Sequence, residues 1–247
     1  MKNKIGWCSM TLNPCWGCRN HCEYCYARAI AKRFWKQRYM EECDYHFKLH
    51  PDWVWTGDHL SGLKDFKPTW LESKFNKKLP KKPQRIFVGS MSEIAHWREE
   101  WVERVIEKVK QYPQHTFQFL TKYPNDVYFK YDFPKNCWLG ITVTKETDMY
   151  KNDWNYLYGK NIYFISFEPL LEEINLHFLN HKNIDWVIIG AETGNRKGKV
   201  IPNLDWVLEI VRYCDYKKIP IYIKGNLSKY YDYKQFPKDL IEFPEVK

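Results

Sequence analysis

The sequence predicts an α/β fold built on a parallel sheet, and two observations predict it. Apolar runs of five to eight residues recur along the chain, each followed by a polar or glycine-containing turn and usually by helix-like sequence. Such alternation of strand and helix is typical of parallel sheets. The 247 residues are 44% hydrophobic and 28% charged, too apolar for a disordered chain and too charged for a membrane protein.

Six runs are predicted as strands, and a seventh run is a further candidate. The six span Ile5–Leu12, Arg85–Met91, Thr116–Leu120, Trp138–Thr144, Ile162–Phe167 and Trp186–Ala191, and the seventh spans Ile219–Lys224. Helices are predicted over Tyr24–Tyr39, Ile94–Gln111 and Leu204–Tyr216. The middle helix has the clearest pattern, because its apolar residues recur at helical spacing with charged residues opposite. We expect one domain over residues 1–247, with an aromatic and basic insertion at about 40–82 and an extension at about 226–247.

The net charge is +9, from 39 basic and 30 acidic residues. This surplus attracts polyanions, although a solvated basic surface explains it equally well. The N-terminus lacks the apolar core of a signal peptide, and no apolar run is long enough to span a membrane. We therefore expect a cytoplasmic protein without a membrane partner.

Cysteine spacing is the most informative feature of the sequence. Of eight cysteines, four fall within eleven residues: Cys15, Cys18, Cys22 and Cys25. Clustered thiols in a cytosolic chain indicate a metal site or redox chemistry. Structural zinc would use all four thiolates, but zinc sites usually separate two ligand pairs by a long loop. An electron-transfer ferredoxin has a different order of spacings and a second group of cysteines.

Three of these cysteines offer another arrangement. Cys18, Cys22 and Cys25 have the spacing C-x3-C-x2-C, which can hold three corners of a [4Fe-4S] cube and leave the fourth iron open to a small molecule. This spacing resembles that of the radical S-adenosylmethionine (SAM) superfamily, in which the residue before the last cysteine is aromatic, as Tyr24 is here. The resemblance implies a partial (βα)6-type barrel of parallel strands, with the cluster loop after the first strand. Cys15 has two possible roles, as a packed loop residue or as a fourth thiolate ligand.

Polar residues follow the predicted strands, at the edge where parallel-sheet proteins place their sites. The five loops are Gly89–Glu93, Thr121–Lys122, Thr142–Thr144, Ser166–Pro169 and Gly190–Gly194. Ordinary turn and helix-cap chemistry explains any one of them. Five in succession favour a common site.

A closer resemblance runs through nearly the whole chain, from Trp7 to Gly225. Its pieces are Leu12–Pro14, Cys25–Ala27, Phe87–Met91, Phe117–Lys122, Trp138–Val143, Ser166–Leu171 and Asp185–Gly194. They resemble a phage-associated three-cysteine family of unknown function, within or near the radical SAM superfamily.

The resemblance implies that a [4Fe-4S] cluster and SAM are the cofactors, with an external one-electron reductant. SAM would be cleaved to methionine and a 5'-deoxyadenosyl radical, which takes hydrogen from an unidentified substrate, with a nucleotide or nucleic acid as one candidate. Cys18, Cys22 and Cys25 are the metal ligands in this hypothesis. The residues assigned to SAM or substrate are Tyr24, Ser90, Ser92, Thr142, Thr144, Ser166, Glu168 and Glu192, with Glu93 as a further helper. Glu168 and Lys122 are the candidate catalytic residues.

The rival hypothesis is a non-catalytic iron–sulfur or zinc protein that binds nucleic acid or senses redox state. The two hypotheses differ in whether one metal coordination site stays open. The insertion Tyr39–Lys82 interleaves aromatic residues with lysines and lacks clear periodicity, so it is either a lid that stacks bases or a small core beside the barrel.

Overall fold

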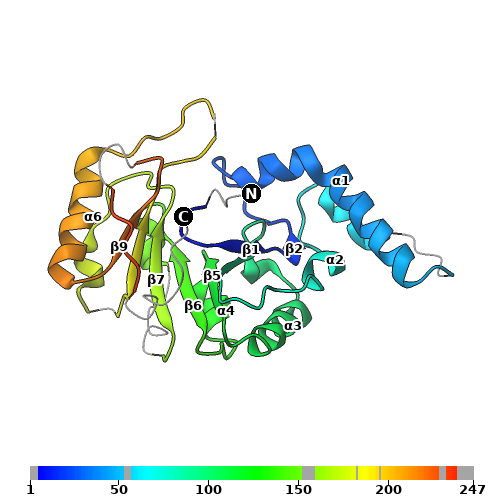
Figure 1. The fold of residues 1–247 in the computed structure, drawn as a ribbon. Helices are drawn as coiled ribbons and strands as arrows, with labels where there is room; N and C mark the ends of the chain where they lie inside the picture. The colour runs from blue at the N-terminus through cyan, green and yellow to red at the C-terminus, as the bar shows by residue number, and fades with distance from the viewer. Residues whose placement is uncertain are drawn as a thin grey trace.

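The computed structural model of the protein describes residues 5–52, 57–151, 159–181, 183–194, 196–227 and 232–237. Within these residues the centre is a seven-stranded sheet in which every neighbouring pair is parallel. In spatial order its strands are β1 (Met10–Leu12), β4 (Arg85–Val88), β5 (Thr116–Thr121), β6 (Cys137–Thr142), β7 (Ile162–Phe167), β8 (Trp186–Ile189) and β9 (Ile221–Ile223). The sheet curves, so that β1 runs across the direction of β7 and β9 (Figure 1). The predicted α/β class and partial barrel are confirmed, with seven strands where six strand–helix units were expected.

The first strand differs most from its predicted bounds. It was expected from Ile5, yet its pairing with β4 begins at Met10. Gly6 has a φ of +85°, a left-handed conformation that glycine adopts readily, so the chain turns before the strand. This turn sends Trp7 and Cys8 into the interior of the curved sheet, where both are buried.

Helices connect the strands and cover the outside of the sheet. They are α1 (Tyr26–Leu49), α2 (Glu72–Phe75), α3 (Glu99–Lys110), α4 (Pro124–Tyr128), α5 (Thr147–Tyr150) and α6 (Leu204–Lys217), with 3-10 turns η1 (Asp58–Leu63), η2 (Ile94–His96) and η4 (Leu176–His181). The predicted helix Ile94–Gln111 is divided, because Trp97 has an extended backbone with a ψ of 158°. The helix predicted over Tyr24–Tyr39 begins at Tyr26 and continues to Leu49.

The alternating residues of each strand build two different cores. On the outer face, residues such as Ile86, Phe117 and Ile165 pack with the buried sides of α3 and α6. On the inner face, Trp7 joins a cluster of Phe87, Trp138, Phe164, Trp186, Ile188 and Tyr222. Gly140 makes this inner packing possible, since a Cβ there would lie only 2.2 Å from Cζ of Phe164. Burying each such side chain stabilises the fold by about 1.5–3 kcal/mol.

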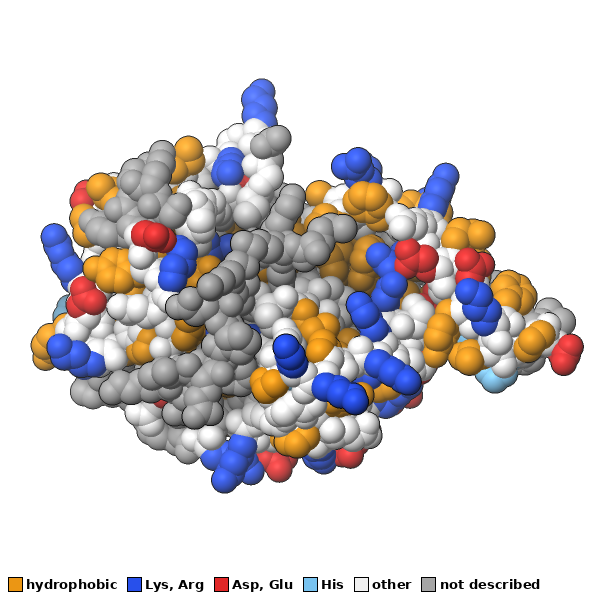
Figure 2. All heavy atoms as spheres, viewed as in Figure 1, with side chains coloured by type: hydrophobic (Ala, Val, Ile, Leu, Met, Phe, Trp, Pro, Cys, Tyr) orange, Lys and Arg blue, Asp and Glu red, His pale blue; other side chains and the backbone are white. Residues whose placement is uncertain are grey.

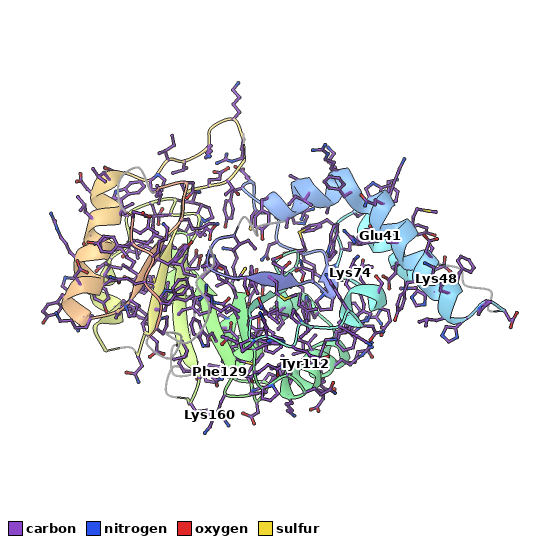
Figure 3. The ribbon with its side chains drawn as sticks, viewed as in Figure 1. Glu41, Lys48, Lys74, Tyr112, Phe129 and Lys160 are labelled. Atoms are coloured by element: carbon purple, nitrogen blue, oxygen red, sulfur yellow. The ribbon has the colours of Figure 1, made fainter. Side chains whose placement is uncertain are left out.

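The insertion is an ordered layer against α1 in the part that the structure describes. Its strand β3 (Thr69–Trp70) pairs antiparallel with β2 (Cys15–Trp16), just before the cysteine loop. Glu42 of α1 is fully buried and accepts hydrogen bonds from the backbone N–H of Ser73 at 3.0 and 3.2 Å. Glu41 and Lys74 lie beside each other, 2.9 Å apart (Figure 3). The small-core interpretation therefore describes this part of the insertion, whereas Trp53 and Trp55 lie outside the described residues.

The described part of the C-terminal extension closes the sheet at the end opposite the polar loops. Trp186 Nε1 donates a hydrogen bond to Gln235 O at 3.0 Å, and Lys234 pairs with Tyr222 of β9. Arg85, at the start of β4, lies over the ring of Phe236 at 4.1 Å. Among the described residues, no helix is both long and apolar enough to cross a membrane.

Candidate active site

A cavity of about 640 Å³ opens at the carboxyl ends of the strands. The structure brings most of the sequence-predicted site residues to its wall: Cys18, Cys22, Tyr24, Cys25, Ser90, Ser92, Glu93, Lys122, Thr142, Glu168 and Glu192. The volume falls within the roughly 300–1,000 Å³ range of small-molecule sites. The loops after the strands thus contribute to one site, as their positions in the sequence predict.

Thr144 and Ser166 lie behind the cavity wall. Both Thr144 N and Oγ1 donate hydrogen bonds to Asp148 Oδ2 at 2.9 Å. Ser166 is fully buried, and its Oγ has no hydrogen-bond partner among the described residues.

The cysteine loop leaves β2 and ends at the first turn of α1. Gly17 has a φ of +110°, and a Cβ there would lie 2.1 Å from Lys67 O, so only glycine lets the loop pass this close to the insertion. Cys25 caps α1, because its Sγ accepts a hydrogen bond from Arg28 N at 3.3 Å. Cys18 Sγ accepts a similar bond from Asn20 N at 3.3 Å. Backbone N–H groups therefore face two of the three thiols.

Two thiols of this loop, Cys18 and Cys25, are in surroundings that favour the protonated form. Burial raises the pKa of Cys18 to about 12 and raises that of Cys25 as well. Among the described residues, no group of three or more His, Cys, Asp or Glu side chains has the arrangement of a metal-ion site. The three thiols lie along one wall of the cavity, and they do not converge on a position where one metal ion could bind.

Cys15 has a different environment from the other three. It is fully buried in β2, within the outer core that contains Leu12 and Trp70, and it does not line the cavity. These apolar neighbours pack around the Cys15 thiol, and burial raises its pKa far above the usual range. The geometry supports the interpretation of Cys15 as a packing residue.

Two tyrosines flank the last cysteine. Lys122 Nζ lies 5.6 Å from the centre of the Tyr24 ring, in cation–π geometry. The Tyr26 hydroxyl donates a hydrogen bond to Ser90 O at 2.6 Å, which joins α1 to the loop after β4. Sequence reasoning gave Tyr26 no role, although it follows Cys25 directly.

Several polar side chains of the loop after β4 form hydrogen bonds within the protein. Ser90 Oγ donates to Asn13 Oδ1 at 3.0 Å, and Ser92 Oγ accepts from Trp97 Nε1 at 3.0 Å. Glu93 accepts hydrogen bonds from the Thr121 hydroxyl and from the backbone N–H groups of Lys122 and Ala95. Glu93 therefore ties the end of β4 to the end of β5.

A charged wall faces the cavity from β7, β8 and β9. Lys224 Nζ forms an ion pair with Glu168 Oε1, and the two side chains are 12% and 19% exposed. Gly190 lies between them, and a Cβ there would be 2.9 Å from Lys224 Cδ and 3.1 Å from Glu168 Cγ. Lys224 follows β9 directly, so it obeys the same strand-end rule as the other residues of the cavity.

A second ion pair extends this wall. Arg196 Nε and Nη2 donate to Glu192 Oε1 and Oε2 at 2.8 and 2.9 Å, in the bidentate geometry that strengthens such pairs. These hydrogen bonds from Arg196 hold the pKa of Glu192 below its usual range. Arg196 Nη1 also lies 3.4 Å from Glu23, so it links the loop after β8 to the cysteine loop.

Aromatic side chains of the inner core also line the cavity. The centres of the Trp7 and Phe87 rings lie 4.6 Å apart, and both residues line the cavity. Trp7 is 1% exposed, and its Nε1 has no hydrogen-bond partner among the described residues. Sequence reasoning missed Trp7 as a site residue, because the run Ile5–Leu12 was expected to be a strand from its first residue.

Comparison with known proteins gives a family but no described relative. Neither the curated proteins nor the solved structures contained a match. One family model matches residues 2–235, which is nearly the whole chain. The chain belongs to the family described as "Protein of unknown function (DUF5131)".

Proposed function

We propose that this protein is a radical SAM enzyme, which cleaves SAM at a [4Fe-4S] cluster and acts on a substrate held in the same cavity. One observation carries the proposal: Cys18, Cys22 and Cys25 line the cavity at the strand ends, whereas Cys15 lies in the outer core. Three thiols therefore line the site, and the fourth is buried in the core and does not reach the cavity. This arrangement supports three protein ligands and one open coordination position.

The donor set fits such a cluster. Thiolates are the usual ligands of iron–sulfur clusters, and a cube with several irons needs ligands that are spread along a wall rather than gathered around one ion. Cys18, Cys22 and Cys25 would hold three irons. The backbone N–H groups of Asn20 and Arg28 already donate to two of these sulfurs, and hydrogen bonds of this kind tune the cluster.

When bound, the cluster supplies the electron that cleaves the C5'–S bond of SAM and so generates the 5'-deoxyadenosyl radical. The residues of this chain bind and orient the two small molecules. Tyr24 offers a ring for the adenine, and Thr142 and Ser90 offer hydroxyls to the ribose and methionine parts. Glu168 and Glu192 offer carboxylates on the opposite wall. Trp7 and Phe87 give the cavity an apolar side, which limits water around a reactive radical.

A second candidate function follows from His96. Its Nδ1 lies 3.7 Å from Cys18 Sγ, so a histidine is near enough to the cysteine loop to be a candidate fourth ligand. A closed cluster would favour a non-catalytic or redox-sensing protein. The same Nδ1 already accepts a hydrogen bond from Arg19 N at 3.2 Å, which occupies the lone pair that a metal would need. This hydrogen bond favours the open site.

The test is anaerobic. The protein is reconstituted with iron and sulfide, SAM and dithionite are added, and 5'-deoxyadenosine is measured by mass spectrometry. We expect product from the wild-type protein and from Cys15→Ser, and none from Cys22→Ala. Cys15→Ser is the matched control, because it removes a neighbouring thiol that does not face the cavity. A wild-type protein that holds about four irons and forms no 5'-deoxyadenosine would overturn the proposal.

A further inference from the structure

An apolar stripe runs along the exposed side of α1. Tyr26, Ile30 and Phe34 follow each other at intervals of four residues, so they lie on one face of the helix. They are 41%, 39% and 38% exposed, although large apolar side chains are usually buried. Within the fold, the opposite side of α1 already packs through Ala27, Ala31 and Cys43. Apart from the Tyr26 hydroxyl, which donates to Ser90 O, the stripe is therefore an apolar surface that the fold leaves exposed.

Basic side chains lie beside this stripe. Lys32, Arg33 and Lys36 are exposed, and the sequence from residue 26 to residue 40 contains no acidic residue. Arg33 lies over the ring of Phe34 at 5.1 Å. Figure 2 shows Lys and Arg side chains among apolar ones where α1 crosses this face. The surface thus combines stacking groups with positive charge.

The stripe is continuous with the cavity. Tyr26 and Ile30 line the cavity wall, and Phe34 lies one helical turn farther out. The loop after β8 contributes Thr193 to the same cavity, and it carries Lys197 and Lys199. A ligand that reaches the cavity therefore passes between two basic elements.

We infer that the substrate is a nucleotide within a single-stranded nucleic acid, whose neighbouring nucleotides lie along α1 from Tyr26 to Lys36. The inference rests on the proposed function for the chemistry inside the cavity. Bases of a single strand expose faces that stack on aromatic side chains, and its phosphates pair with Lys and Arg. A duplex hides those faces, and a cavity of about 640 Å³ admits one nucleotide rather than a helix.

The arrangement of exposed side chains on α1 favours a nucleic acid over a membrane surface as its ligand. A helix that lies on a membrane has a broad continuous apolar face with basic residues on the other side. Between Tyr26 and Lys36 the exposed apolar stripe of α1 is one residue wide, with Arg33 next to it and Lys36 and Lys32 farther round the helix. Met40 and Phe47 are exposed farther along the same helix. The opposite side is already used in the protein core and contains the buried Glu42. This narrow, interleaved pattern matches a strand of alternating bases and phosphates.

The experiment measures binding of labelled single-stranded DNA and RNA, each of about 20 nucleotides, to the reconstituted protein by fluorescence anisotropy. We expect Phe34→Ala to raise Kd about tenfold, through the loss of one stacked base. The double variant Arg33→Glu/Lys36→Glu should raise Kd further and lower the slope of log K against log salt by about 2. The DNA and RNA arms show which strand is preferred.

The matched control lies on α6. Tyr216 is 79% exposed, and Lys217 lies over its ring at 5.5 Å, so this helix also offers an exposed aromatic residue beside positive charge. It ends before β9 begins, at the end of the sheet opposite the cavity. Tyr216→Ala and Arg212→Glu should leave Kd unchanged.

Three results would overturn the inference: no binding by the wild-type protein, equal binding by all variants, or equal losses from α1 and α6. Binding to anionic lipid vesicles that is lost in the α1 variants, with no binding to either strand, would also overturn it. 5'-Deoxyadenosine formation is measured on the same samples. Formation without strand binding contradicts the inference and leaves the proposed function standing. Strand binding through α1 without formation contradicts the proposed function instead.

Discussion

The two walls of the cavity differ in how their polar groups are satisfied. On the wall formed by β7, β8 and β9, the carboxylates of Glu168 and Glu192 are paired with Lys224 and Arg196. On the cysteine wall, half-buried thiols line the cavity, and the sulfurs of Cys18 and Cys25 accept hydrogen bonds from backbone N–H groups. The carboxylates of the charged wall are thus fixed by ion pairs, whereas two thiols of the cysteine wall are positioned by backbone hydrogen bonds. Ion pairs therefore orient the carboxylates that the proposal assigns to SAM or substrate, and backbone donors orient the thiols that it assigns to the cluster.

Among substitutions in the charged wall, Lys224→Met is expected to lower the free energy of unfolding most. The variant leaves Glu168 without its partner in a mostly buried position, and breaking such a pair costs about 3 kcal/mol in the free energy of unfolding. Urea denaturation at neutral pH measures the loss. The double variant Lys224→Met/Glu168→Gln should recover most of it, because it removes both charges. A double variant as unstable as the single one would show that Lys224 acts through packing.

Arg196→Met is expected to have a smaller effect that depends on pH. Arg196 holds the pKa of Glu192 below its usual range, so the pair stabilises the folded state above the unfolded pKa of about 4.5. That contribution is lost as the pH falls through the lower folded pKa. The variant should therefore be less stable than the wild type at pH 7 and should approach it in acid. A difference that stays constant from pH 7 to about pH 3 would contradict this assignment.

The smallest effect is expected on the cysteine wall from Tyr26→Phe. The substitution removes the hydrogen bond to Ser90 O and keeps the ring, so unfolding should become easier by about 1 kcal/mol. Thermal unfolding measures the change. Tyr150→Phe is the matched control, because that exposed tyrosine donates to Glu146, only four residues earlier in the chain. A larger loss from Tyr150→Phe than from Tyr26→Phe would show that the Tyr26 contact contributes little.

The strand pattern made much of the fold and of the site predictable. Ile162–Phe167 became β7 with its predicted bounds, and the polar residues after the strands lie around one cavity. Carboxyl ends of parallel strands share an edge, so local sequence was sufficient to bring Ser90 and Glu168 to the same site.

Other features depend on contacts that local sequence does not encode. The pairing of Glu168 with Lys224 needs the close approach that Gly190 allows, across residues far apart in the chain. Trp7 enters the cavity because the chain turns at Gly6, a break that an apolar run does not reveal. The β2–β3 pair has two residues in each strand, too few to show any periodicity.

The central claim is that the cysteine wall holds a cluster with one open iron. The most direct measurement is the electron paramagnetic resonance spectrum of the reduced, reconstituted protein, recorded with and without SAM. Our account predicts that SAM changes the spectrum in the wild type and in Cys15→Ser, because SAM binds the open iron. A protein with about four irons whose spectrum is the same with and without SAM would contradict it.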